Sequence, residues 1–402
     1  MNVIVVGGGA AGLLAAGFAV RGGHDVTVIE RNPRPARKVM ITGKGRCNLT
    51  NACSPADCVE NTPRNGRFLY SALSAFSPQD AMALVEAQGV PLKVERGGRV
   101  FPVSDKAVDV VDALVRFADC RFRQGRVTRL LIDDGVCCGV ELENGERLEA
   151  YAVVVCTGGL SYPQTGSTGD GYTLARQAGH TIVSPRPSLV PLVCAEEDCP
   201  RMQGLSLKNC GLTMADDATG KVVYRDFGEL LFTHFGVSGP VILSASAHVQ
   251  PGQTYTLTLD LKPALSPAQL DARLVRELEQ EKNRDVGNML PSLLPRKMVA
   301  VMAQRAGIPL DRKCHTVTRE ERGRLGAALK SFSLHVTGTR PIAEAIITAG
   351  GVSVREIHAK TMASKLVSGL YFAGEVLDVD AYTGGFNLQI AMATGAAAGR
   401  SI

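Results

Sequence analysis

The chain has 402 residues, of which 45% are hydrophobic and 21% are charged, and its mean hydropathy is +0.06. These values indicate a soluble globular protein with a sizeable core, exclude a disordered chain, and favour two or three domains. The 44 basic and 39 acidic residues give a net charge of +5 without a polybasic run, which excludes a basic nucleic-acid arm and leaves a shallow basic surface open.

The eleven cysteines do not form a recognisable framework. Their number is odd, and no two have the two-residue spacing of a zinc knuckle or a redox dithiol, so we expect reduced thiols and no metal site. The first apolar run is interrupted at once by glycines, and no stretch approaches the roughly 18 apolar residues of a membrane helix. The sequence therefore predicts a cytoplasmic protein without membrane contact.

The N-terminal 30 residues have the pattern of a βαβ unit. Residues 3–6 form an apolar run directly before three glycines, and residues 10–20 are rich in alanine and leucine. A second apolar run at 26–29 is closed by Glu30. Short apolar runs of this kind are typical of buried parallel strands.

The next part of the chain changes from helical to strand patterns. Asp-Asp-Gly at 133–135 and Asn-Gly at 144–145 are strong hairpin signals between runs rich in β-branched residues. The last of these runs meets Thr157-Gly158-Gly159, as a central strand ending in a glycine turn would. We expect helices at 78–89 and 106–119 and strands at 126–132, 136–142 and 147–155.

A different region begins near residue 185 and ends near 341. It is strand-like over 190–260 and helical over 267–307, with breaks at Pro291 and Pro295, and one more helix is expected at 319–332. Beyond it the buried, glycine-punctuated pattern returns. It covers 346–351 and 370–375, and an alanine-rich helix at 388–400 follows.

Residues 7–12, Gly-Gly-Gly-Ala-Ala-Gly, fit the G-x-G-x-x-G dinucleotide fingerprint between a strand and a helix. Gly7 permits the tight turn, Gly9 lets a pyrophosphate approach the backbone, and Gly12 lets helix and strand pack closely. The free N–H groups and the positive dipole end of the helix would bind the phosphates. Glu30 would accept hydrogen bonds from the adenosine ribose.

A second glycine–acid pair, Gly374-Glu375, favours FAD over NAD, because the far end of the longer FAD molecule needs its own contacts. Most flavoproteins of this type have Asp where Glu375 stands. Residues 384–389 then lead into the last helix, whose N-terminus could stabilise negative charge on the reduced isoalloxazine. Residues 166–171 are also glycine-rich, but their spacing is wrong for a fingerprint and no buried strand precedes them. A reducing NAD(P)H should therefore dock transiently.

Several segments are similar to one known family. Residues 42–51, Thr-Gly-Lys-Gly-Arg-Cys-Asn-Leu-Thr-Asn, resemble the G-x-G-R-C-N-x-T-N signature of the BaiN/YhiN-like flavoproteins, some of which are labelled aminoacetone oxidases. Residues 231–240, 348–352 and 372–389 match the family in the same order, so the resemblance covers the whole chain. It implies an NAD(P)H-linked oxidoreductase of the ene-reductase kind. Members are associated with reduction of dehydro bile acids, and others with dihydrouridine formation in ribosomal RNA.

The resemblance also implies an α/β fold with a Rossmann-type FAD-binding domain that is discontinuous in sequence, an inserted β-rich domain and a small helical subdomain. We expect the FAD-binding domain at 1–189 and 341–402. The β-rich domain is expected at 190–265 and 310–340, and the helical subdomain at 266–309.

In the chemistry that the resemblance implies, a carbon–carbon double bond conjugated to a carbonyl accepts hydride, and the resulting enolate needs stabilisation and a proton. Arg46 is a candidate to steady phosphate or anionic flavin, or a surface cation. Asn48 would donate to a flavin carbonyl or stabilise its loop. Cys47, His234 and Tyr382 are candidate catalytic residues. For Cys47 a small buried structural role explains the residue at least as well, and for His234 a structural role explains it better.

The complete set of residues that we expect to bind the cofactor comprises Gly7, Gly9, Ala10, Ala11, Gly12, Glu30, Arg31, Lys38, Gly45, Arg46, Cys47, Asn48, Val127, Thr157, Gly158, Gly159, Gly374, Glu375, Gly385, Phe386, Asn387 and Leu388.

Three functions follow as hypotheses. The first is a FAD-dependent reductase that uses NAD(P)H on a small, flat enone such as a dehydro bile acid or steroid. The second is a dihydrouridine synthase acting on ribosomal RNA. The third is a flavin sensor without catalysis. It is the weakest hypothesis, because the glycine-lined flavin region resembles a catalytic arrangement.

Overall fold

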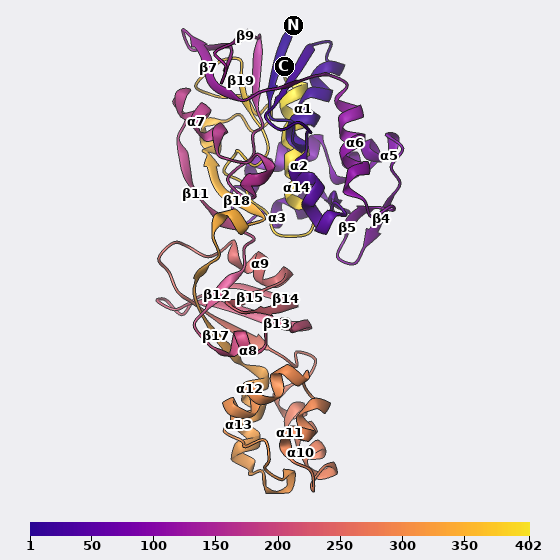
Figure 1. Cartoon of the computed structure of the whole chain (residues 1–402), viewed down its shortest axis with the longest axis vertical. Helices are drawn as coiled ribbons and strands as arrows, with labels where there is room; N and C mark the ends of the chain where they lie inside the picture. The colour runs from indigo at the N-terminus through magenta and orange to yellow at the C-terminus, as the bar shows by residue number, and fades with distance from the viewer. The chain divides into compact units, whose positions relative to one another are not determined.

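The computed structural model describes residues 1–402, which form two compact units. Unit 1 comprises Met1–Ser188 and Pro341–Ile402, and unit 2 comprises Leu189–Arg340. Both ends of the chain lie in unit 1, where the indigo and yellow parts of the ribbon run side by side (Figure 1). No helix is long and apolar enough to cross a membrane.

Unit 1 is built on a five-stranded parallel sheet in the order β19-β10-β1-β2-β6. The βαβ unit predicted at the N-terminus is confirmed, and the strand predicted before Thr157 lies beside β1. The edge strand β6 was not predicted, because its residues Arg-Phe-Arg-Gln lack an apolar run. The strands are β1 (Asn2–Val6), β2 (Asp25–Glu30), β6 (Arg121–Gln124), β10 (Ala152–Val155) and β19 (Leu370–Phe372).

Two helices from opposite ends of the chain, α1 (Ala10–Arg21) and α14 (Phe386–Arg400), pack against each other. Their backbones approach closely, since a Cβ atom on Gly395 would lie 2.2 Å from the carbonyl oxygen of Ala11. Helix α6 (Ala107–Ala118) packs against α1 as well. The helices predicted at 10–20, 106–119 and 388–400 are therefore confirmed, and the last begins two residues earlier.

Three small antiparallel sheets complete unit 1. The single strand predicted at 147–155 was wrong. The chain bends at Ala150-Tyr151, because β9 pairs antiparallel with β8 while β10 pairs parallel with β1. The sheets are β7 (Val127–Asp133), β8 (Val136–Leu142) and β9 (Arg147–Glu149); β3 (Thr50–Asn51), β5 (Arg99–Pro102) and β4 (Leu92–Glu95); and β11 (Ile182–Ser188) with β18 (Ile347–Val352). The remaining helices are α2 (Arg37–Ile41), α3 (Pro55–Glu60), α4 (Tyr70–Ala75), α5 (Pro78–Ala87) and α7 (Asp170–Gln177).

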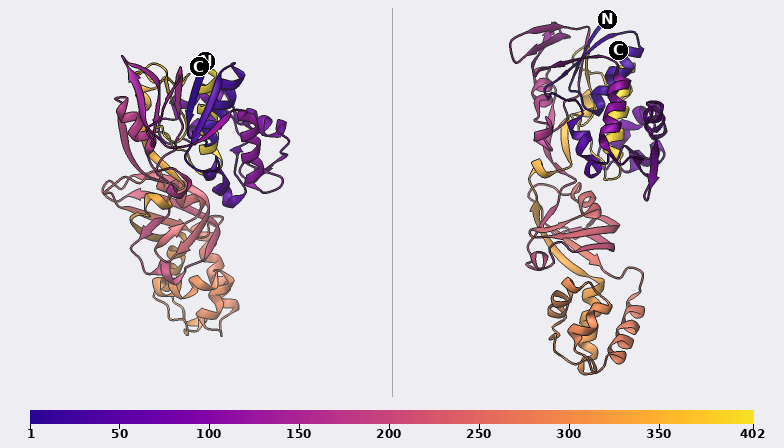
Figure 2. Two further views of the ribbon diagram at one scale, coloured as in Figure 1. Left: turned by 45° about the horizontal axis from the view of Figure 1, so that its top comes forward. Right: turned by 45° about the vertical axis from the view of Figure 1, so that its right-hand side comes forward.

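Unit 2 contains a closed antiparallel barrel in the order β12-β15-β14-β13-β16-β17. Figure 2 shows its strands and the neighbouring helices from two further directions. The barrel strands are β12 (Leu192–Cys194), β13 (Ser206–Asp216), β14 (Val222–Thr233), β15 (Gly236–Ser238), β16 (Tyr255–Asp260) and β17 (Phe332–Thr339).

The helical part of unit 2 shares one hydrophobic core with the barrel. The predicted break at Pro295 is confirmed, because Pro295 caps the N-terminus of α12, and Pro291 lies in a short 3-10 turn. Helix α9 was not predicted, since it is short and lies within a strand-rich region. The helices are α8 (Asp198–Arg201), α9 (Pro240–Ser246), α10 (Pro267–Gln280), α11 (Val286–Met289), α12 (Arg296–Ala306) and α13 (Arg319–Lys330).

Candidate functional site

A cavity of unit 1 lies at the carboxyl ends of the parallel strands and has a volume of about 1200 Å³, part of it open to solvent. Each strand of the sheet delivers its following residue there: Gly7 after β1, Gly125 after β6, Thr157 beyond β10 and Gly374 beyond β19, with Glu30 ending β2. Ligands of doubly wound sheets bind at this edge, because the loops diverge there on either side of the first strand.

In the turn after β1, Gly7, Gly9 and Gly12 are each required for a different reason. Gly7 has φ +100, and a Cβ atom there would lie 2.6 Å from the carbonyl oxygen of Cys156. At Gly12 a Cβ atom would lie 1.9 Å from the carbonyl oxygen of Gly7. Gly9 differs, since a Cβ atom there would meet no protein atom within 4 Å and would project into open space beside the cavity.

The residues around this turn fit a dinucleotide. Helix α1 has no side-chain cap and no acidic residue in its first turn, so its first N–H groups are available to a phosphate. The Oγ1 atom of Thr157, on the cavity wall, is buried and has no hydrogen-bond partner in the protein. A buried polar atom of this kind is satisfied when a polar ligand fills the cavity.

Glu30 is held rigidly at the end of β2. One carboxylate oxygen accepts from the backbone N of Gly8 at 2.8 Å, and the other accepts from the backbone N and the side-chain amide of Asn32, both at 2.8 Å. Each oxygen keeps acceptor capacity toward the cavity, which Glu30 lines. This arrangement suits the ribose contact expected from the sequence.

Glu375 forms an ion pair with Lys38 within the cavity wall, at a distance of 2.5 Å. Its other oxygen accepts from the hydroxyl of Ser161 at 2.7 Å and from the backbone N of Thr348 at 2.9 Å. The Glu side chain, which is longer than the Asp of most such flavoproteins, therefore reaches hydrogen-bonding partners in the protein itself. Gly159 packs behind the wall, since a Cβ atom there would lie 2.4 Å from Oγ1 of Thr348.

The signature segment at 42–51 braces the start of α14. With its amide oriented to satisfy both groups, Asn48 accepts from the backbone N of Gly385 at 3.0 Å and donates to the carbonyl oxygen of Thr50 at 3.2 Å. The Thr50 hydroxyl donates to Gln389 at 2.8 Å, and Asn51 donates to the carbonyl of Gly384 at 3.1 Å. These contacts fix the uncapped N-terminus of α14, where Asn387 and Leu388 line the cavity.

Four predicted residues of this segment do not line the cavity: Gly45, Arg46, Cys47 and Asn48. Arg46 donates to Asp105 at 2.8 Å, pairs with Glu95, and lies over the ring of Phe101. Cys47 is fully buried, and this burial raises the pKa of its thiol to about 12. Its left-handed backbone, with φ +60, turns the chain toward the bracing residues.

The other two candidate catalytic residues are far apart in sequence and belong to different units. His234 is exposed in unit 2, in the turn between β14 and β15, with its ring against that of Phe235. Tyr382 is half-buried in unit 1, and its carbonyl oxygen accepts from the side-chain amide of Asn387 at 3.3 Å. Phe386, at the first position of α14, is buried.

Of the residues expected to bind the cofactor, those that line the cavity are Gly7, Gly9, Ala10, Ala11, Glu30, Arg31, Lys38, Val127, Thr157, Gly158, Gly374, Glu375, Asn387 and Leu388.

The cavity also has lining residues that were not predicted from the sequence. Several of them follow β2, precede β7 or lie in or next to the glycine-rich segment at 166–171, which was set aside above because its spacing is wrong for a fingerprint. Glycines clustered at the N-terminus of a helix were the signal that could have found the segment. The polar residues among them are Asn32, Arg37, Thr42, Arg126, Thr165, Ser167 and Asp170.

The family model of the HI0933-like protein Rossmann domain matches residues 1–401 of this chain. A ribosomal RNA dihydrouridine synthase of Haemophilus influenzae is 33% identical over 99% of this chain and 98% of its own length. A 3-dehydro-bile acid delta(4,6)-reductase of Clostridium scindens is 29% identical over 100% of this chain and 99% of its own length.

Among solved structures, 3-ketosteroid delta1-dehydrogenase from Sterolibacterium denitrificans aligns with a TM-score of 0.51 at 13% identity, over 99% of this chain and 98% of that one. This likeness concerns the fold alone. The family match spans nearly the whole chain, and it agrees with the BaiN/YhiN-like resemblance of the motifs. The chain therefore belongs to the HI0933-like family of Rossmann-type, FAD-dependent oxidoreductases.

Proposed function

We propose that this protein takes hydride from NAD(P)H and reduces a carbon–carbon double bond conjugated to a carbonyl group. The observation that carries this proposal is the full-length relationship to two curated relatives whose names both describe such a reduction. The delta(4,6) bonds of a 3-dehydro-bile acid are conjugated to its 3-keto group. The bond reduced when uridine becomes dihydrouridine is likewise conjugated to a ring carbonyl.

When bound, FAD supplies the ring that carries hydride between the two substrates. The protein contributes the fixed positive end of α14, whose first turn has no acidic residue and whose start is braced by Asn48 and Thr50. A pre-oriented helix N-terminus stabilises negative charge without reorganisation. Because the sequence has one dinucleotide fingerprint, we expect NAD(P)H to dock transiently.

Tyr382 is our candidate for the proton donor because it lies just before the Gly384-Gly385 turn, where the bond from the Asn387 amide to its backbone carbonyl holds it beside the start of α14. We predict that Tyr382→Phe lowers the rate of the oxidative half-reaction by about 10²-fold, the lower limit for loss of a general acid. The rate of flavin reduction by NAD(P)H should stay unchanged. Stopped-flow absorbance measures both half-reactions separately. Equal slowing of both would show a positioning role and remove Tyr382 as the acid.

The two substrates differ in what the protein must recognise beyond the double bond. Residues 266–330 contain thirteen basic and eight acidic residues, so this stretch carries a surplus of +5, equal to that of the whole chain. Four of its cations, Arg276, Lys282, Arg296 and Arg319, are exposed and form no ion pair with a carboxylate. A concentrated basic surplus suits a polyanion better than a bile acid with a single carboxylate. We therefore propose ribosomal RNA as the substrate, and a small enone as the second candidate.

The decisive experiment uses purified holoprotein, reduced anaerobically with NADPH or NADH. Reoxidation is then followed with unmodified ribosomal RNA and, separately, with a 3-keto-delta4 steroid. We expect RNA to reoxidise the flavin and dihydrouridine to appear in the RNA by mass spectrometry. If the steroid reoxidises the flavin and the RNA does not, the substrate is a small enone and the RNA hypothesis is wrong. If neither oxidant works, ene reduction is wrong, and a flavin sensor without catalysis becomes the better hypothesis.

A further inference from the structure

The glycine-rich segment at 166–171 has no role in the proposed reaction. It follows a short 3-10 turn, Pro163–Thr165, and leads into α7. Gly166, Ser167 and Asp170 line the cavity, although no buried strand precedes them as in a fingerprint. The segment therefore contributes to the cavity wall by another route than the glycine turn after β1.

Its place along the cavity follows from Glu30. The backbone N of Gly125 donates to the backbone carbonyl oxygen of Glu30 at 2.9 Å. Arg126, the next residue, is therefore close in the fold to the residue whose carboxylate is expected to bind the ribose, and both line the cavity. The adenine ring is bonded to that ribose and must lie within a few ångströms of it. The wall formed by Arg31, Arg126 and Asp170 is thus the wall of the adenosine end.

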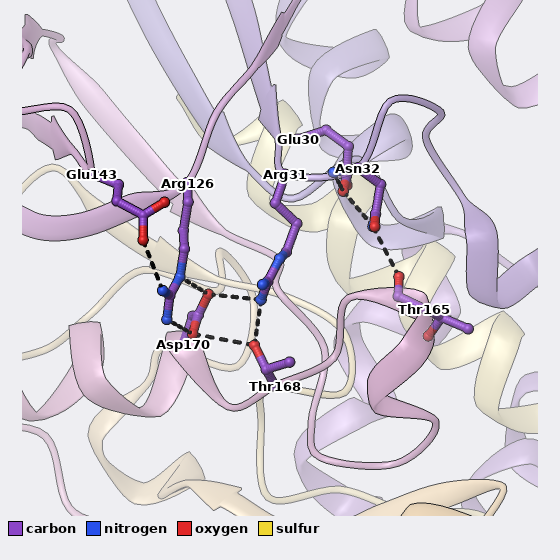
Figure 3. A network of polar contacts seen from close by, with 8 residues as sticks. All are labelled: Glu30, Arg31, Asn32, Arg126, Glu143, Thr165, Thr168 and Asp170. Carbon is purple, nitrogen blue, oxygen red and sulfur yellow. Dashed lines mark hydrogen bonds and ion pairs between the residues drawn. The ribbon is translucent and has the colours of Figure 1, made fainter.

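Asp170 joins the two arginines on this wall (Figure 3). Arg126 donates to its two oxygens at 3.0 and 2.9 Å, and Arg31 pairs with it at 3.3 Å. The Asp170 side chain is only 19% exposed. Burial works to raise its pKa, but the hydrogen bond and charge of Arg126 and the charge of Arg31 outweigh burial and hold the pKa below its usual range. The bridge is therefore fully ionised at neutral pH.

Further polar contacts pin the same turn to the residues after β2. Arg31 donates to the hydroxyl of Thr168 at 2.5 Å, and Asn32 donates to the carbonyl oxygen of Thr165 at 3.0 Å. The fit is close, because a Cβ atom on Gly166 would lie 2.6 Å from the Asn32 amide nitrogen. The two hydrogen bonds are partly exposed, so water can replace them when the turn moves away.

We propose that residues 165–170 form a clasp over the adenosine half of FAD, fastened by Asp170 between Arg31 and Arg126. The clasp joins three segments that are remote in sequence: the end of β2, the start of β7 and the N-terminus of α7. Opening it exposes the adenosine end of the cavity, and closing it holds the cofactor. The clasp acts on cofactor retention and is independent of which substrate is reduced.

Asp170→Asn tests the clasp, since it preserves shape and removes the charge that both arginines share. We expect the holoprotein to release FAD faster and the Kd for FAD to rise about tenfold, the effect of removing one charge-assisted hydrogen bond. Recovery of flavin fluorescence after dilution measures the release. FMN lacks the adenylate, so its Kd for the flavin-free protein should not change.

Glu143→Gln is the matched control. It removes the other carboxylate partner of Arg126, which is 64% exposed, and leaves the bridge to Arg31 intact. We expect FAD release from this variant to match the unmodified protein. Arg31→Gln opens the clasp from its other side and serves if Asp170→Asn does not fold. An unchanged Kd for FAD in both variants, or equal weakening of FAD and FMN, would overturn the proposal.

Discussion

A buried histidine of unit 1 connects residues that are remote in sequence. His180 is 3% exposed, and its Nδ1 lies 3.1 Å from a carboxylate oxygen of Glu356. Its Nε2 lies 2.8 Å from the hydroxyl of Ser364, and its ring packs edge-on against Phe372 of β19. The contacts resemble a hydrolytic triad, but the Ser364 oxygen also accepts from two backbone N–H groups, so the arrangement is structural.

This histidine makes stability depend on pH. Burial lowers the pKa of His180 below its ordinary value, although the Glu356 carboxylate acts to raise it. Between the unfolded pKa of about 6.5 and the lower folded pKa, the unfolded chain binds more protons than the native one. The free energy of unfolding should therefore fall as pH decreases through this window, by at most about 1.4 kcal/mol per pH unit.

His180→Gln should remove that part of the pH dependence while lowering stability at neutral pH. Urea denaturation followed by circular dichroism, at several pH values from about 7.5 to 5.5, measures the slope in both proteins. A slope that is unchanged in the variant would show that another group is responsible.

At the scale of elements, the cavity depends on how α1 meets β1. The helix can begin immediately after the strand because Gly7 takes a left-handed φ and Gly12 allows backbone contact. Gly9 has an ordinary φ of −78 and sits at the N-cap, so neither its backbone nor the surrounding protein excludes a larger residue. Within one turn, Gly7 and Gly12 are thus required for folding, whereas Gly9 is required for ligand binding.

Two alanine substitutions test this separation. Gly12→Ala should destabilise the protein by about 3 kcal/mol or more, since the added methyl overlaps a carbonyl oxygen. Gly9→Ala should leave the Tm of the flavin-free protein within a few degrees of the original and weaken FAD at least about tenfold, because its methyl occupies cofactor space. Thermal unfolding and FAD titration measure the two effects. The reverse pattern would contradict the assignment.

The elements that the sequence missed share a physical cause. Strand β6 is polar at the sheet edge, and β17 follows a helix without a turn signal. The run at 147–155 looked like one strand, because β-branched periodicity continues across the bend that sends β9 and β10 to different sheets. Periodicity records which residues are buried in extended chain, and the partner strand is chosen by tertiary contacts.

At the scale of the whole molecule, each unit has its own hydrophobic core, and the surplus of charge is unevenly distributed. The residues outside 266–330 contain as many basic as acidic residues. The surplus of unit 2 lies in a helical part whose other cations are largely paired, such as Arg312 with Glu321 and Lys313 with Asp285. The unpaired cations are those free to meet an external anion.

Replacing Arg276, Lys282, Arg296 and Arg319 together by Gln should therefore weaken binding of ribosomal RNA. The slope of log Kd against log salt should fall by about 1 for each phosphate that is no longer neutralised, while reduction of a small enone stays unchanged. Filter binding at several salt concentrations provides the slopes. The control replaces four exposed, unpaired cations of unit 1, Arg96, Arg129, Arg176 and Lys360. Equal weakening in both variants would indicate non-specific attraction.

The sequence by itself determined the cofactor-binding frame of this protein. The glycine turn, Glu30, Gly374 and the segments flanking them have conformations set by neighbours in the chain, so local pattern predicts them. The family signature at 42–51 was likewise visible, because it is continuous in sequence.

Only the tertiary structure decided what several of these residues contact. Asn48 braces Gly385 from more than 300 positions away, Lys38 pairs with Glu375, and Asp170 joins Arg31 to Arg126. Each of these contacts unites segments that the chain separates. Their ion pairs depend on which charges the fold brings within hydrogen-bonding distance, and no spacing along the chain encodes that distance.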